Sequence, residues 1–214
     1  MGIYAALYYC GSVTFRDGLL LVKKAWEKIS KVTAEGKYGM GMIVGLTESD
    51  ILDLLHGSGE VRICNQNNLH TFIISGTFEA VTGILSLAKA EGALRANLLP
   101  VSKPYHSDFI KSAVPEFTEI VRELTILAPA YKYISNIGQK IITSSDGLRE
   151  EVIQNLYRRM NWFNAMNYLL ALGAEVFFEC GAGDGLTRNF RFIEGNFKSF
   201  SANKLEDFLE TVSD

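Results

Sequence analysis

Apolar residues recur along the chain with two different periods. Residues 3–9 are almost wholly apolar and Gly11 follows them, which is typical of a helix that ends at a glycine. A second helix is predicted over 15–32, because apolar side chains recur there at helical spacing (Phe15, Leu19, Val22, Trp26 and Ile29). Thr14 begins a segment with the character of a capping box. The chain therefore opens with two helices.

The elements that the apolar pattern predicts become shorter between residues 37 and 103. Apolar runs typical of strands fall at 39–46, 61–65, 71–75 and 93–99. A short helix capped by residues 47–50 is predicted to run through Leu55, and an amphipathic helix that begins near Val81 is predicted to end at Gly92. The order β-α-β-β-α-β is that of a ferredoxin-like unit. We therefore predict an α/β chain in which residues 37–103 form an inserted ferredoxin-like subdomain, while residues 1–36 and 104–214 form a larger α/β body.

Longer elements return after residue 106. A helical stripe covers 109–124, and Pro115 is expected to kink or split it. Short strands are predicted at 131–135, 140–143 and 175–179 and near Ser199, with helices at 148–156, 162–170 and 204–212.

Composition and charge exclude some classes of partner. The net charge of −3 argues against a nucleic-acid or anionic-membrane surface, which would need a basic excess. No apolar run approaches the roughly 20 residues of a membrane span. The first residues also lack the pattern of a signal peptide. Three cysteines in unlike contexts are typical of reduced thiols, so a cytoplasmic protein is expected.

His106 is the first candidate for chemistry. The predicted strand at 93–99 leads through a proline-broken turn to His106 and Ser107, where a helix should begin. This position suits a general base, since histidine titrates near neutral pH. It equally suits a partly exposed neighbour of a helix cap, with Ser107 as the capping residue. The sequence offers no G-x-S-x-G elbow that would supply a nucleophile.

A glycine-rich run after the strand at 175–179 is the rival site. A strand followed by alternating glycines is similar to the cofactor loop of Rossmann-like methyltransferases, although too few residues follow Gly185 to complete that fold. A tight turn from strand to helix is the simpler explanation of the glycines. The remaining polar clusters suggest turns or solvated helix positions: His56, His70, the asparagines 65, 67 and 68, Lys23-Lys24 and Arg158-Arg159.

Several segments, taken in order, carry a more specific signal. They are Met1-Gly2-Ile3-Tyr4-Ala5-Ala6-Leu7, 39–46, Asn65-x-Asn67, Ile73-Ile74-Ser75-Gly76, Ser102-Lys103-Pro104-Tyr105-His106-Ser107, Ser135-Asn136, Leu156-Tyr157 with Trp162, and Glu179-Cys180-Gly181-Ala182-Gly183. In this order they resemble the malonyl-CoA:acyl-carrier-protein transacylase family, which includes the acyltransferase domains of polyketide synthases. The first is similar to the residues after the nucleophilic serine in the motif G-H-S-x-G-E-Y-A-A-L. The fifth is similar to S-x-P-F-H-S, which bears the catalytic histidine.

The resemblance implies a fold, an activity and a site. The fold is a hydrolase-like α/β acyltransferase body with an inserted ferredoxin-like subdomain. The activity is transfer of an acyl group from acyl-CoA to the phosphopantetheine thiol of an acyl carrier protein, in fatty-acid or polyketide biosynthesis, through a Ser/His mechanism without a bound cofactor. His106 matches the general base, and the backbone carbonyl that orients it matches Asn155.

The sequence departs from the family pattern in three ways, one of which is that it does not contain the family's N-terminal portion with the G-Q-G oxyanion segment and the first core strand. Met1 aligns with the residue just after the serine, so we expect the body to be incomplete at its N-terminus, apolar surface to be exposed, and the chain to be inactive alone or to need a second chain. Ala25 aligns with the arginine that holds a malonyl carboxylate, and this favours an uncharged acyl group. An acyl hydrolase and a non-catalytic or split partner-binding protein remain alternatives.

Overall fold

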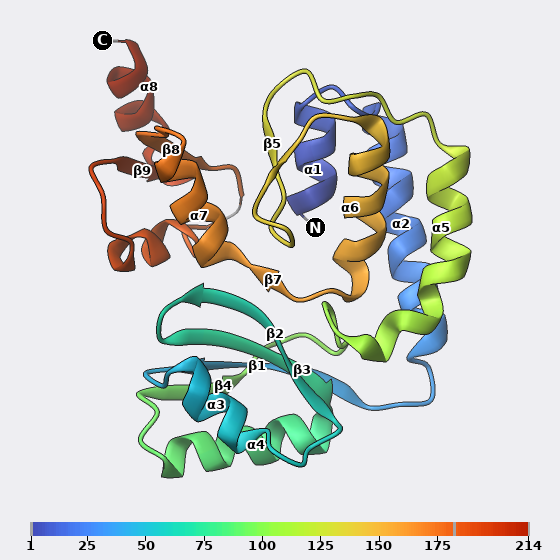
Figure 1. Cartoon of the computed structure of the whole chain (residues 1–214), viewed down its shortest axis with the longest axis vertical. Helices are drawn as coiled ribbons and strands as arrows, with labels where there is room; N and C mark the ends of the chain where they lie inside the picture. Colours follow the sequence, from blue (N-terminus) through green and yellow to red (C-terminus); the bar gives the residue numbers. More distant parts are fainter. Residues whose placement is uncertain (1, 182, 214) are drawn as a thin grey trace.

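The computed structural model describes residues 2–181 and 183–213. Met1 and Ala182, which belong to two of the motifs, and Asp214, which ends the predicted body, lie outside the described residues. The described chain has a helical body, a sheet-based unit below it and a small C-terminal unit beside it (Figure 1).

Helices build the body. They are α1 (Gly2–Tyr9), α2 (Phe15–Val32), the 3₁₀ helix η1 (Asp108–Ala113), α5 (Val114–Glu123) and α6 (Ser145–Tyr157), with a small antiparallel pair β5 (Tyr133–Ile134) and β6 (Ile141–Ile142). They enclose one apolar core, in which Leu7, Leu21, Phe117, Val121 and Leu148 are fully buried. The predicted stripe at 109–124 is split before Pro115, as expected, since proline begins a helix well but breaks its interior.

The sheet below the body is the inserted unit. Its elements are β1 (Tyr38–Val44), α3 (Glu48–Leu54), β2 (Val61–Asn68), β3 (Thr71–Thr77), α4 (Phe78–Ala90) and β4 (Arg95–Leu98). The antiparallel strand order β4-β1-β3-β2 is followed by β7 (Met160–Asn161), which comes from the body and pairs in parallel with β2. This unit has its own core under α3 and α4. The proposed subdomain boundaries at residues 36/37 and 103/104 stay a prediction.

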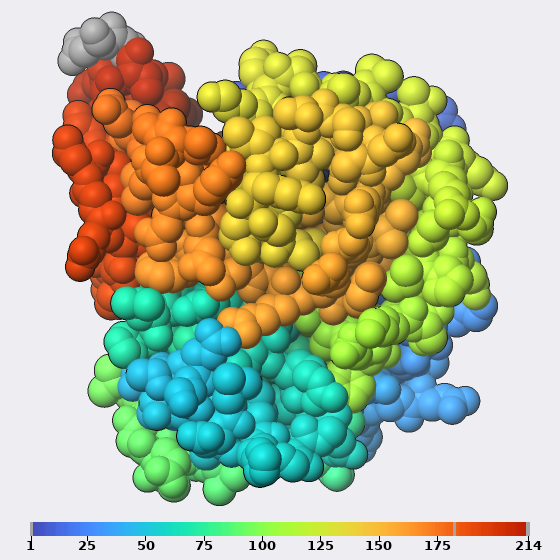
Figure 2. All heavy atoms as spheres, in the orientation of Figure 1, coloured from blue at the N-terminus to red at the C-terminus, as the bar shows by residue number. Residues whose placement is uncertain are grey.

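The C-terminal unit lies beside the body and above the inserted unit in the view of Figure 2. It holds α7 (Trp162–Ala171), β8 (Val176–Glu179), η2 (Thr187–Phe192), β9 (Lys198–Ser201), η3 (Ala202–Lys204) and α8 (Leu205–Ser213). The strands β8 and β9 pair in parallel, and Trp162, Phe190 and Ile193 form a third core. β7 and α7 thus join all three parts of the molecule.

The prediction about which side of α2 faces the core was partly wrong. The helix buries Gly18, Leu21, Ala25 and Ile29 against the body. Phe15, Leu19 and Trp26, which the periodicity grouped with Ile29, are instead 62%, 55% and 59% exposed. Apolar side chains lie on two sides of this helix, and the body covers only one of them, so periodicity alone could not identify the buried side.

Candidate functional site

His106 has an unusual backbone conformation in the loop that follows β4. Its φ angle of 56° lies in the left-handed region, which residues other than glycine seldom adopt. Its amide donates a hydrogen bond to the Leu156 carbonyl (3.0 Å). Its ring Nδ1 lies 2.7 Å from the Asn155 carbonyl oxygen. Two bonds to one helix end therefore hold both the backbone and the ring of His106.

These two carbonyls belong to the last turn of α6. The last four carbonyls of a helix lack partners within the helix, and His106 satisfies two of them. Because a carbonyl oxygen only accepts, Nδ1 must carry the ring proton. The lone pair of the neutral ring is then on Nε2, the nitrogen a general base would use.

The environment of His106 keeps its ring neutral. Burial lowers the pKa of His106 from 6.5 to about 4, and the bond to the Asn155 carbonyl opposes this only in part. At neutral pH the ring is therefore unprotonated and able to accept a proton.

The ring faces a hollow of about 380 Å³, which we call the His106 hollow. Its wall combines the start of α1, the strand β2, the hairpin β5–β6 and the segment from α6 to α7. Among the lining residues are Gly2, Asn65, His106, Asn136, Asn155 and Trp162. The fold thus brings together residues as far apart in the sequence as Gly2 and Leu186. Gly2, Asn65, His106, Asn136 and Trp162 belong to the motifs quoted above.

Ser107 does not cap the following helix. It is buried, and its hydroxyl donates to the Pro104 carbonyl at 2.6 Å. No side-chain bond from Ser107 reaches the start of η1. The capping prediction was therefore wrong, because the left-handed turn at His106 directs Ser107 back toward Pro104.

The asparagine cluster lies on a strand rather than in a turn. Asn65, Asn67 and Asn68 belong to β2, whose pairing with β3 is shifted twice in this stretch. The Asn65 side chain donates to Asn67 Oδ1 (2.7 Å) and accepts from the Trp162 amide (3.3 Å). The predicted turn was wrong, because the irregular pairing lets polar side chains join the sheet to α7.

The described residues that follow β8, 181 and 183–186, form bends and a turn. Glu179 closes it, accepting bonds from the Leu186 amide (3.1 Å) and from the Thr187 amide and hydroxyl (both 2.7 Å). Gly183 has a φ angle of 109°, which other residues rarely adopt. Leu186 reaches the His106 hollow. Turn formation therefore accounts for the glycines.

Ala25 belongs to α2 and is not among the described residues that line the His106 hollow. It is buried in the body core on α2, with only 5% of its surface exposed. The neighbouring Lys24 pairs with Glu27 (2.9 Å) on the surface of the same helix. The two residues therefore lie on different faces of α2.

Two predictions near His106 need correction: Glu151 was not identified from the sequence, and the pair Arg158-Arg159 was assigned to a helix. Glu151 is buried on α6, accepts a 2.6 Å bond from the Ser135 hydroxyl and lines the His106 hollow. Burial raises the pKa of Glu151. Its spacing from Leu148 and Asn155 could have revealed it, because these positions share one helix face. The pair Arg158-Arg159 is not within a helix as predicted, since α6 ends at Tyr157.

Among the described residues there is no metal-binding cluster, no disulfide bond and no membrane-spanning helix. Residues 2–181 and 183–213 contain no group of His, Cys, Asp or Glu side chains able to hold a metal ion. Cys10 and Cys64 are buried, Cys180 is exposed, and none of the three is in a disulfide. No helix within the described part of the chain has the length and apolarity to cross a membrane.

Comparison with known proteins identifies the family. The malonyl CoA-acyl carrier protein transacylase of Escherichia coli K12 is 30% identical over 190 residues, which are 87% of this chain and 62% of that protein. The solved structure of FabD from Acinetobacter baumannii superposes with a TM-score of 0.90 at 30% identity, over 98% of this chain and 69% of that one. The chain belongs to the malonyl-CoA:acyl-carrier-protein transacylase family.

A third relative is a solved complex. It contains a type II polyketide-synthase acyl-carrier protein bound to its malonyl-transacylase, which superposes with a TM-score of 0.89 at 26% identity, over 94% of this chain and 66% of that one. No family model matches the chain. The superpositions confirm the predicted acyltransferase fold with its mixed α/β architecture. The chain spans 62% of the length of the Escherichia coli relative.

Proposed function

We propose that the chain carries the general-base part of an acyltransferase that moves an acyl group from acyl-CoA to the phosphopantetheine thiol of an acyl carrier protein. One observation carries the proposal: His106 is fixed by the end of α6 with Nε2 unprotonated, beside a hollow that Gly2 also lines. The names of the relatives and the carrier-protein complex of one of them support the choice of substrates.

The chemistry needs a hydroxyl nucleophile and one base. Nε2 of His106 would take the proton of a serine hydroxyl as its oxygen attacks the thioester carbonyl. The same proton would then leave with the thiol of coenzyme A. In the second half, Nε2 would take the proton of the carrier thiol as its sulfur attacks the acyl-serine ester, and would give that proton to the serine oxygen as the ester bond breaks. Asn155 would keep the ring oriented through both halves.

The nucleophile of this proposal is a serine that aligns just ahead of Met1. Among the described residues that line the His106 hollow there is no serine. Cys10 does line it, but its thiol is 3% exposed and lies 3.1 Å from the Ser12 hydroxyl. We therefore expect residues 1–214 alone to form no acyl-enzyme.

The acyl group is proposed to be uncharged. The aligned family arginine would give a malonyl carboxylate a bidentate partner, and Ala25 cannot. Lys24 does not replace it, since its ammonium group is held by Glu27 on another face of α2.

Intact-mass spectrometry tests the nucleophile. The chain is compared with a fusion in which the N-terminal part of the Escherichia coli relative, ending at Gly-His-Ser, precedes Met1. After incubation with acetyl-CoA, an acyl adduct is expected on the fusion and none on residues 1–214. An adduct on residues 1–214 that disappears in Cys10→Ala would contradict the proposal.

Product analysis separates the two activities. With a phosphopantetheinylated carrier protein present, the fusion should yield acyl-carrier protein. Release of free acid in its place would make the protein an acyl hydrolase. A fusion that folds and binds the carrier protein but transfers nothing would favour the non-catalytic alternative.

Variants at residue 25 test the acyl group. Ala25→Arg in the fusion should raise the ratio of malonyl to acetyl transfer, because a guanidinium binds a carboxylate in a bidentate manner. Ala25→Lys is the matched control, since it adds the charge without that geometry. Both variants are first checked for an unchanged fold by circular dichroism, because residue 25 is buried. Efficient malonyl transfer by the fusion with Ala25 would contradict this part of the proposal.

A further inference from the structure

Glu151 is the buried acidic residue of the His106 hollow. It lies on α6, is 6% exposed, and lines the hollow together with His106 and Gly2. Asn155, whose carbonyl holds the His106 ring, follows four residues later, which is about 6 Å along the helix axis and on the same face. Glu151 is the only residue of the described chain that lines both this hollow and a smaller one of about 210 Å³. Its side chain therefore belongs to the wall of the space that contains the base.

The carboxylate of Glu151 has hydrogen-bond donors but no ion pair. The Ser135 hydroxyl donates to it at 2.6 Å, and the Asn136 amide is a second donor. No basic side chain among residues 2–181 and 183–213 lies within ion-pair distance of it, and Lys140 acts on it only at longer range. A carboxylate accepts up to about four hydrogen bonds, so acceptor positions remain open. Burying a carboxylate without a cation is costly, and perturbed carboxyl groups of this kind are concentrated at functional sites.

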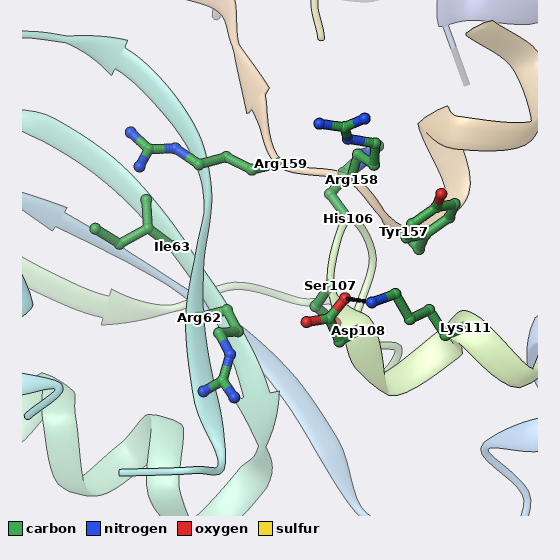
Figure 3. Close-up of a pocket in the computed structure, with 9 residues that line it drawn as sticks. All are labelled: Arg62, Ile63, His106, Ser107, Asp108, Lys111, Tyr157, Arg158 and Arg159. Carbon is green, nitrogen blue, oxygen red and sulfur yellow. Dashed lines mark ion pairs between the residues drawn. The ribbon is translucent and has the colours of Figure 1, made fainter. Parts of the chain in front are cut away.

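The charge of Glu151 is not balanced inside the His106 hollow. Of the described side chains that line this hollow, Glu151 and Lys132 carry a formal charge, while the ring of His106 is neutral. Lys132 is exposed, so solvent screens its charge more than that of the buried carboxylate. The other basic side chains near His106 line a neighbouring hollow and not this one (Figure 3): Arg62, Lys111, Arg158 and Arg159.

We infer that Glu151 determines which acyl groups the His106 hollow accepts: it favours an acyl group with a hydrogen-bond donor, such as a hydroxyacyl group, and disfavours one with a carboxylate. A donor on the acyl chain would fill an open acceptor position of Glu151, whereas a second negative charge would be repelled at short range. The inference rests on the proposed function, because it needs an acyl group beside His106. It is independent of Ala25, since Glu151 acts by repulsion within the hollow itself.

A purely structural role of Glu151 makes a different prediction. If Glu151 only anchors the β5–β6 hairpin, its charge is unimportant as long as Ser135 keeps an acceptor. Glu151→Gln separates the two roles, because the amide oxygen still accepts from Ser135 while the charge is lost. Glu151→Ala removes both the charge and the acceptor.

Competition between matched acyl groups tests the inference in the fusion protein. Malonyl-CoA and acetoacetyl-CoA are similar in size and differ in charge, while 3-hydroxypropionyl-CoA and butyryl-CoA are similar in length and differ in one hydroxyl. The measured quantity is kcat/KM for formation of the acyl-carrier protein, at pH 8, which favours the ionised carboxylate that burial disfavours. The unmodified fusion should prefer acetoacetyl over malonyl and 3-hydroxypropionyl over butyryl.

The two variants should change these preferences differently. Glu151→Gln should reduce the preference for acetoacetyl over malonyl about tenfold or more and keep the preference for the hydroxyl, because the charge is lost and the acceptor remains. Glu151→Ala should lose both preferences. Glu150→Gln is the matched control: it makes the same change at the neighbouring, exposed position of α6, which does not line the His106 hollow, and it should alter neither preference. Circular dichroism melts check that all variants remain folded.

A binding measurement on residues 1–214 keeps the inference testable without acyl transfer. The ring signal of His106, assigned by its loss in His106→Gln, is followed by NMR while 3-hydroxypropionyl-pantetheine or malonyl-pantetheine is added. The hydroxyacyl compound should bind more tightly, and Glu151→Gln should bring the two affinities together.

The outcomes separate the inference from the proposed function. A fusion that transfers acyl groups with preferences that Glu151→Gln leaves unchanged overturns the inference and leaves the proposed function standing. A folded fusion that transfers nothing overturns the proposed function, and the ratio of the two pantetheine affinities then decides the inference. Equal affinities in the unmodified chain overturn it.

Discussion

At the scale of the residue, His106 combines three properties that a base requires. Its ring is oriented by the Asn155 carbonyl, its accepting nitrogen is unprotonated, and burial keeps it neutral. A positive φ angle costs conformational energy, which the two bonds to α6 offset. Backbone strain of this kind is found mostly at functional sites, where it helps to hold a side chain in one orientation.

The first prediction concerns the titration of His106. Its ring should titrate near pH 4 in the chain, which an NMR titration measures directly. Between pH 6.5 and about 4 the unfolded chain binds a proton at this residue that the folded chain does not. The free energy of unfolding should therefore fall as the pH is lowered through this range.

The matched control is His106→Gln, which cannot titrate. Urea unfolding at pH 7 and pH 5 should show a smaller loss of stability in this variant than in the unmodified chain. Equal losses in the two proteins, or a ring that titrates near 6.5, would contradict the burial of His106.

At the scale of the element, α6 organises the site. Its last turn holds His106, and one turn earlier Glu151 anchors the β5–β6 hairpin through Ser135. The Ser135 hydroxyl also accepts bonds from the Ile137 (3.1 Å) and Gly138 (2.7 Å) amides, which closes the turn of that hairpin. One helix therefore positions two walls of the His106 hollow.

Ser135→Ala should destabilise this arrangement. The change leaves the buried Glu151 carboxyl without its hydroxyl donor, so we expect the free energy of unfolding to fall by about 1–3 kcal/mol. Urea unfolding at pH 7 measures it. Ser86→Ala on the exposed side of α4 should change stability by less than about 0.5 kcal/mol. A similar small change in Ser135→Ala would show that Glu151 is satisfied in another way.

The elements themselves were largely predictable, because caps and periodicity are local. The cap at Thr14, whose side chain accepts a bond from the Asp17 amide, and the glycine after α1 both occur as the sequence indicates. The roles of Asn65 and Ser107 were not predictable from local pattern. Each depends on a partner brought in by the fold, namely Trp162 across the sheet and the Pro104 carbonyl in the left-handed turn.

At the scale of the molecule, three cores are joined around one loop. The body, the inserted sheet and the C-terminal unit (Figure 1) each bury their own apolar residues. His106 lies in the segment between β4 of the inserted sheet and η1 of the body. Apolar side chains are exposed on α2: Phe15, Leu19 and Trp26 form a stripe along the helix, and the Phe15 ring contacts Tyr8 of α1. Exposed apolar patches of this kind favour association.

The exposed stripe should make the chain self-associate. Sedimentation velocity over a range of concentrations should show reversible association that Leu19→Gln with Trp26→Gln weakens about tenfold or more, since each change removes apolar area from the contact. Leu87→Gln on α4, 51% exposed in the unmodified chain, is the control and should have no effect. A chain that remains monomeric at every concentration would contradict this prediction.

The central claim is that His106 is the base for acyl transfer, and the rate of serine acylation in the fusion protein tests it most directly. Rapid mixing with acetyl-CoA, quenching at set times and intact-mass spectrometry give the rate of serine acylation for the fusion and for its His106→Gln variant. We predict a loss of about 10²-fold or more in the variant with an unchanged melting profile. Equal acylation rates in the two proteins would contradict the account.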